Sequence, residues 1–72
     1  MNYNYKLLKT RIRRYYGSQE EFAKVLHLST NSLNKKLNNK VCFNQREISI
    51  MIDTLDIKKL EIKDYFFTLK VQ

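Results

Sequence analysis

The residues best suited to specific recognition lie between Ser18 and Lys40, in the stretch SQEEFAKVLHLSTNSLNKKLNNK. The second half of this stretch is rich in Asn, Ser and Thr, with Lys among them. An Asn amide donates and accepts a hydrogen bond at the same time, so it suits the N6 and N7 edge of adenine, and a Lys can hold a phosphate. The chemistry that this stretch supports is therefore hydrogen bonding to a polar partner.

No catalytic or metal-binding pattern accompanies the stretch. The sequence contains no Gly-rich phosphate loop, no Cys/His cluster at metal spacing, and no nucleophile beside a candidate base. His27, the only histidine, is expected to face solvent or pack in a turn. Cys42, the only cysteine, cannot form an internal disulfide and is expected to be a small buried or half-buried side chain in a reducing compartment. We expect no enzymatic activity and no cofactor.

Capping signals predict two short helices in this stretch. Ser18 is a good N-cap and Glu21 completes a Ser-x-x-Glu capping box, so one helix should span 19–26. Ser29 is a second N-cap for a helix over 30–37, in which Leu33 and Leu37 mark the buried side. Polar residues are then left on the other sides of this second helix: Thr30, Asn31, Asn34 and Lys35.

Three more helices are predicted outside the stretch. Apolar residues at helical spacing indicate a helix over 5–16, and the Asn44–Glu47 capping box begins one over 45–55. A short last helix over 58–64 should turn Leu60 and Ile62 toward the core. One Gly and no Pro also favour helices. The sequence thus predicts one all-α, compact five-helix domain over 1–72, with a core of Leu8, Ile12, Phe22, Ala23, Leu26, Leu33, Leu37, Ile48, Ile52 and Leu55.

The net charge of +7 is concentrated in the first part of the chain. Through Arg46 there are ten basic and two acidic residues, which gives +8, and the rest carries −1. Such a positive field attracts phosphate and other polyanions. Basic residues on the predicted first helix fit a solvated face, phosphate contact or partner docking equally well.

The end of the chain changes period. Phe67, Leu69 and Val71 alternate with polar residues, as in a strand. Since a single strand cannot satisfy its own backbone groups, this short extended tail should either pack on the domain or pair with a second chain, which leaves a homodimer possible. No apolar run reaches the length of a membrane span, and the N-terminus lacks the apolar core of a signal peptide, so we expect a soluble protein in the cytoplasm.

The stretch 18–40 resembles the helix-turn-helix of Cro and C-repressor-like phage regulators, which have the lambda-repressor-like fold. Gln19, Ala23 and Leu33 match the pattern of that family; His27 stands where it usually has Gly, and Lys36 where it usually has an apolar residue. The run KLNNKVCFNQREI, followed by LDI and DYFF, is similar to very short lytic-side regulators of temperate phages of Gram-positive bacteria. These include Cro-like proteins and the modulator-of-repression antirepressors.

Two functions follow from the resemblance. As an antirepressor, the protein would bind the N-terminal helix-turn-helix domain of its phage's C repressor, inside the bacterial host cell, through its own motif. As a Cro-like repressor, it would bind operator DNA directly, as a dimer. In either case the binding residues would be those that face outward from the motif and the loop after it: Gln19, Thr30, Asn31, Asn34, Lys35, Asn38, Asn39 and Lys40.

Overall fold

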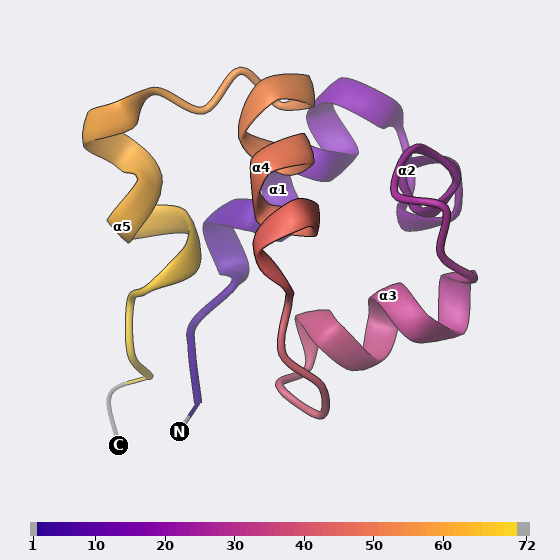
Figure 1. The fold of residues 1–72 in the computed structure, drawn as a ribbon, viewed down its shortest axis with the longest axis horizontal. Coiled ribbons are helices and arrows are strands. Elements are labelled where there is room, and N and C mark those ends of the chain that lie inside the picture. The colour runs from indigo at the N-terminus through magenta and orange to yellow at the C-terminus, as the bar shows by residue number, and fades with distance from the viewer. Residues whose placement is uncertain (1, 71–72) are drawn as a thin grey trace.

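The computed structural model describes residues 2–70 and confirms an all-α fold of five helices (Figure 1). The described part of the chain measures 31 × 25 × 21 Å. Its elements are α1 (Lys6–Tyr16), α2 (Gln19–Val25), α3 (Thr30–Leu37), α4 (Gln45–Thr54), the 3-10 helix η1 (Lys59–Glu61) and α5 (Ile62–Phe66). The first four agree with the predicted ranges to within a residue, whereas the last predicted helix is divided between η1 and α5.

The helices end in tight turns that use the left-handed backbone region. Gly17 follows α1 with φ of 85°, and three residues other than glycine follow α2, α3 and α4: His27 (φ 56°), Asn39 (φ 65°) and Asp56 (φ 52°). In each of these three turns the next N–H reaches back to a carbonyl five residues earlier, as Leu28 N–H does to the Ala23 carbonyl at 2.9 Å. This is the Schellman arrangement, and His, Asn and Asp are the residue types that tolerate it best after glycine.

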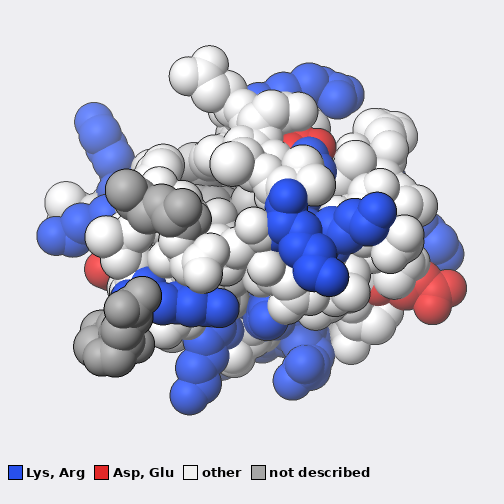
Figure 2. All heavy atoms as spheres, turned by 90° about the horizontal axis from the view of Figure 1, so that it is seen from below, with Lys and Arg blue, Asp and Glu red and all other residues white. Residues whose placement is uncertain are grey.

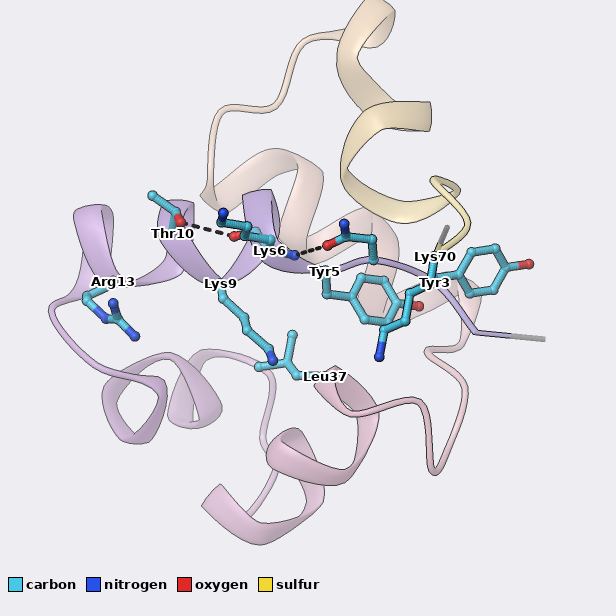
Figure 3. Close-up of a pocket in the computed structure, with 9 residues that line it drawn as sticks. Tyr3, Tyr5, Lys6, Lys9, Thr10, Arg13, Leu37 and Lys70 are labelled. Atoms are coloured by element: carbon cyan, nitrogen blue, oxygen red, sulfur yellow. Dashed lines mark hydrogen bonds between the residues drawn. The ribbon is translucent and has the colours of Figure 1, made fainter. Parts of the chain in front are cut away.

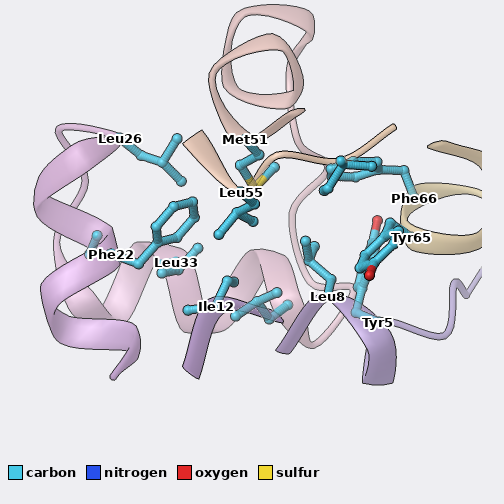
Figure 4. Close-up of a cluster of buried hydrophobic side chains, with 13 residues drawn as sticks. Tyr5, Leu8, Ile12, Phe22, Leu26, Leu33, Met51, Leu55, Tyr65 and Phe66 are labelled. Atoms are coloured by element: carbon cyan, nitrogen blue, oxygen red, sulfur yellow. The ribbon is translucent and has the colours of Figure 1, made fainter. Parts of the chain in front are cut away.

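The core is assembled from all five helices around α1 (Figure 4). Leu8 and Ile12 of α1 are fully buried, and so are Phe22, Leu33 and Leu55. Eight of the ten predicted core residues are buried as expected. Buried hydrophobic residues outside this list of ten are Tyr5, Ile57, Tyr65 and Phe66, together with Met51, which the apolar spacing of 45–55 also predicted to face the core.

The predicted core stripe of α4, Ile48, Met51, Ile52 and Leu55, is confirmed at Met51 and Leu55 and was wrong at Ile48 and Ile52. Ile48 and Ile52 are only partly buried, and the buried stripe runs through Glu47, Met51 and Leu55. These three positions are four residues apart and so share one side of the helix. This orientation follows from Glu47, because its carboxylate is drawn into the interior by a basic partner described below.

Two side chains expected inside lie outside. Leu60, in the middle of η1, is 88% exposed, because Ile57 before it and Tyr65 and Phe66 after it fill this end of the core. Cys42 is also exposed. In the loop after α3 it is Phe43, the residue after Cys42, that packs inward, with its ring edge-on to Tyr5 at 5.5 Å between ring centroids.

The tail packs on its own chain. Leu69 forms an antiparallel bridge with Tyr3, and the Asn4 N–H donates to the Thr68 carbonyl at 2.6 Å. Figure 1 accordingly shows the segment before α1 and the segment after α5 side by side. Of the two alternatives drawn from the alternating pattern, the first is therefore observed, with Phe67 lying edge-on to Tyr3. Val71, the last member of the pattern, lies outside the described residues.

Candidate functional site

The candidate site is built on α2, the turn at residues 26–29, and α3. Ser18 caps α2 as predicted, since its hydroxyl accepts from the Glu21 N–H at 3.2 Å. The Glu21 carboxylate, however, accepts from Lys24 at 3.2 Å, so the second half of the predicted capping box is replaced by an ion pair. His27 is exposed and holds the left-handed position of the turn. His27 therefore adopts the left-handed conformation that glycine commonly adopts after a helix, and its side chain stays exposed.

The orientation of α3 is fixed by its cap and by its buried side. Ser29 accepts from the Ser32 N–H at 3.0 Å and begins the helix at Thr30. Leu33 and Leu37 are buried, which turns the other sides of α3 to solvent. The four residues predicted to face outward are all exposed: Thr30, Asn31, Asn34 and Lys35. We call this group the outer face of α3.

The other four predicted contact residues have different surroundings. Gln19 is half-buried at the start of α2, and Lys40 is exposed, with its N–H bonded to the Lys35 carbonyl at 2.9 Å. The Asn38 amide donates to the Asn34 backbone and side-chain oxygens at 2.9 and 3.1 Å, which brings these two side chains together. The loop after α3 is thus folded against the end of the helix.

Asn39 has a structural role that the sequence did not indicate. Its side-chain oxygen accepts from the Tyr3 N–H and its amide nitrogen donates to the Tyr3 carbonyl, both at 2.8 Å. The Asn39 amide therefore joins the loop after α3 to the N-terminal segment. An Asn next to a turn signals a possible left-handed residue, but nothing local identifies a partner 36 positions away.

The contact that most strongly positions α3 was also missed. Lys36 Nζ lies 2.6 Å from Glu47 Oε1, and the two side chains are only 12% and 6% exposed. The same Glu47 oxygen accepts from the Asn44 N–H at 3.0 Å, and the Asn44 side chain accepts from the Glu47 N–H, which completes the predicted capping box. One buried carboxylate thus neutralises a lysine of α3 and caps α4. The sequence did contain one signal for this pair, because Lys36 stands where Cro-like regulators usually have an apolar residue.

The side of the molecule that carries α3 is predominantly basic. Figure 2 shows this side, where Lys and Arg atoms outnumber those of Asp and Glu. Within residues 2–70, no group of His, Cys, Asp and Glu side chains could hold a metal ion. In the same range, no helix has the length and apolar character needed to cross a membrane. The arrangement offers hydrogen-bond donors, acceptors and cations to a partner.

Comparison with known proteins identifies the family. The family model described as "Protein of unknown function (DUF739)" matches residues 1–69. The chain belongs to this DUF739 family. The solution structure of the modulator of repression (MOR) of the temperate bacteriophage TP901-1 from Lactococcus lactis also matches this DUF739 member, with a TM-score of 0.79 and 35% sequence identity. That match covers 100% of this chain and 97% of the other. No curated protein matches the chain described here.

The match to a modulator of repression supports the resemblance to that group of small phage regulators. It spans the whole chain at an identity high enough to indicate more than a shared fold. The DUF739 member described here is accordingly a small all-helical phage regulator, and its similarity indicates a role in regulating phage repression.

Proposed function

We propose that the protein is a phage antirepressor that binds the C repressor of its phage through the outer face of α3. The observation that carries this proposal is the full-length similarity to a phage modulator of repression, at 35% identity. On this proposal α2, the turn and α3 form a helix-turn-helix whose target is the N-terminal helix-turn-helix domain of the repressor. The protein acts in the cytoplasm of the bacterial host and has no catalytic role.

The composition of the outer face of α3 supports a protein partner. Three of its four residues, Thr30, Asn31 and Asn34, are short and uncharged, and only Lys35 is a cation. Such amides and hydroxyls pair with the polar side chains of another recognition helix at little desolvation cost. A helix that reads DNA is usually accompanied by several cations that bind the flanking phosphates. The outer face of α3 has only one cation, Lys35.

The rigidity of α3 supports the same proposal. The helix is capped at its start, folded against its own loop at its end, and joined to α4 by the Lys36–Glu47 pair. A surface held in this way loses little conformational freedom on binding, which favours affinity. Tyr16 and Phe43 pack against the core and are therefore not available as apolar anchors for a partner. Val41, in the loop after α3, remains 48% exposed and is available as an anchor.

The test is a double variant, Asn31→Glu with Asn34→Glu, titrated against the purified N-terminal domain of the repressor by calorimetry. We expect a one-to-one complex for the wild type and at least a tenfold loss of affinity for the variant, because two carboxylates replace two amides at the centre of the contact. The helical circular dichroism should not change. The matched control is Gln45→Glu with Ser49→Glu, since both residues are exposed on α4. Undiminished binding by the first variant would show that α3 is not the contact surface.

A Cro-like repressor is the second candidate, and the +8 charge of the first 46 residues favours it. As a Cro-like dimer, the protein would place the outer face of α3 in the major groove of operator DNA and would hold phosphates with Lys40. A band-shift experiment at physiological salt separates the two functions. A specific shift without repressor supports the Cro-like function, whereas capture of the repressor without such a shift supports the antirepressor.

A further inference from the structure

A cavity of about 310 Å³ lies beside α1, and none of the four residues of the outer face of α3 lines it (Figure 3). Both ends of the chain contribute to it, together with the last residue of α3. Its lining consists of Tyr3, Asn4, Tyr5, Lys6, Lys9, Thr10, Arg13, Leu37 and Lys70. Figure 3 shows Lys9 and Lys70 extending from α1 and from the tail toward the side on which Leu37 lies.

The fold itself brings these residues together. The Lys70 N–H donates to the Asn2 carbonyl at 3.1 Å, which holds the tail beside the start of the chain. Asn39 holds Tyr3 from the other side through its two hydrogen bonds. The cavity therefore depends on contacts between segments that are more than 30 residues apart in sequence. It is a feature of the folded domain and not of one helix.

The lining is strongly cationic. Four of its nine residues are Lys or Arg and none is Asp or Glu. The two ion pairs found within residues 2–70 are Lys24–Glu21 and Lys36–Glu47, so none of these four cations is neutralised by a carboxylate of the described chain. Burial raises the pKa of Tyr5 above its ordinary value of 10.0, so this phenol adds no negative charge at neutral pH.

The helix at the cavity runs against the usual preference for charge. The first turn of α1 contains no acidic residue and begins with Lys6, although a helix N-terminus favours negative side chains. Lys6, Lys9 and Arg13 are spaced by three and four residues and so share one side of α1. Along the axis Lys9 and Arg13 are about 6 Å apart, at 1.5 Å per residue. The helix dipole favours Arg13, which lies in the last turn of α1, but it disfavours Lys6 in the first turn, and an anionic ligand would account for that position.

We propose that this cavity binds the sugar-phosphate backbone of a nucleic acid. A row of cations on long side chains matches anions that repeat along a strand, and it requires no base recognition. An acidic protein segment is the alternative occupant, and the competition with polyglutamate described below tests it. This inference does not depend on the proposed function, because none of its residues belongs to the outer face of α3.

The test is the salt dependence of DNA binding, measured by anisotropy with a fluorescein-labelled duplex of random sequence and the same strand alone. The variant is Lys9→Glu with Arg13→Glu. It should bind the duplex at least tenfold more weakly at low salt. The slope of log Kobs against log salt should fall by about 1.8, since each phosphate contact contributes about 0.9. Arg14→Glu with Lys59→Glu changes the net charge equally outside the cavity and should retain the slope.

Other outcomes overturn the inference. Equal losses in the two double variants would show that only the net charge acts, and polyglutamate that competes as well as DNA at equal charge would point to an acidic protein partner. Absence of binding by the wild type at low salt would also refute the proposal. If the charge-reversed variant fails to fold, Lys9→Gln with Arg13→Gln decides, because it removes both cations without introducing carboxylates. Loss of repressor capture is not expected from any of these cavity variants, so the two proposals fail separately.

Discussion

The two sides of α3 serve different purposes, although both carry polar residues. On the inner side Lys36 is almost buried and is matched by a single carboxylate, Glu47, at 2.6 Å. On the outer side Asn31 and Thr30 are exposed, and their side chains form no hydrogen bond to another side chain or backbone group of residues 2–70. A polar residue on the inner side is thus a requirement of this fold, whereas one on the outer side is available to a partner. Variants on the two sides should separate stability from binding.

The largest expected effect concerns the buried ion pair. Lys36→Met or Glu47→Gln alone leaves one buried charge without its partner and should lower the free energy of unfolding by about 3–5 kcal/mol. The double variant should lose much less than the two single changes together, because no uncompensated charge remains and the new amide oxygen at position 47 can still accept from the Asn44 N–H. Urea denaturation at neutral pH measures all three. Single changes that each cost under about 1 kcal/mol would show that water screens the pair.

A slightly smaller effect is expected from the apolar part of the inner side. Leu33 is fully buried, so Leu33→Ala should cost about 2–5 kcal/mol through lost burial and the cavity that remains. The matched control is Asn31→Ala on the same helix, which should change the free energy of unfolding by less than about 0.5 kcal/mol. Thermal unfolding of the two variants measures the difference. Similar melting temperatures would mean that α3 is not packed as described, and the contrast between its sides would be lost.

The same contrast explains which features could be predicted from the sequence. The caps Ser18, Ser29 and Asn44 and the apolar spacing in α2 and α3 are local signals, and they placed both helices and the exposed residues of α3 correctly. The sequence analysis assigned Glu47 only a capping role, because the Asn44–Glu47 capping box requires no residue from another helix. Its burial depends on Lys36 in another helix, and this long-range pairing places Glu47 on the buried side of α4 and leaves Ile48 and Ile52 partly buried.

The tail and the loop after α3 show the same limit. The alternation of Phe67 and Leu69 predicted extended backbone, which is found at Leu69 in its bridge with Tyr3, whereas Phe67 caps the end of α5 with ψ of 16°. Period alone does not reveal which segment completes the hydrogen bonds. Asn39 was predicted to be a contact residue because it follows the recognition-like helix, whereas its amide is bound to Tyr3. In both cases the partner is the N-terminal segment, which lies far away in sequence.

The smallest effect concerns the turn that leads into α3. His27→Gly should raise the free energy of unfolding by up to about 1 kcal/mol, because glycine adopts the left-handed conformation without strain and the exposed imidazole gives up no core contact. Part of this gain is offset by the greater freedom of glycine in the unfolded chain. The melting temperature should rise by a few degrees, at about 4–8 °C per kcal/mol for a domain of this size.

Asn39→Gly is the control for this turn, because it has the same backbone conformation but a different side-chain environment. Glycine at position 39 also relieves the left-handed strain, yet it removes both hydrogen bonds to Tyr3, and Asn39→Gly should therefore lower the melting temperature. Melting temperatures that change in opposite directions would establish that backbone conformation determines the effect at His27 and that side-chain hydrogen bonds determine it at Asn39. A lower melting temperature for His27→Gly would instead reveal a stabilising role of the imidazole, and the turn would belong with the inner side of α3.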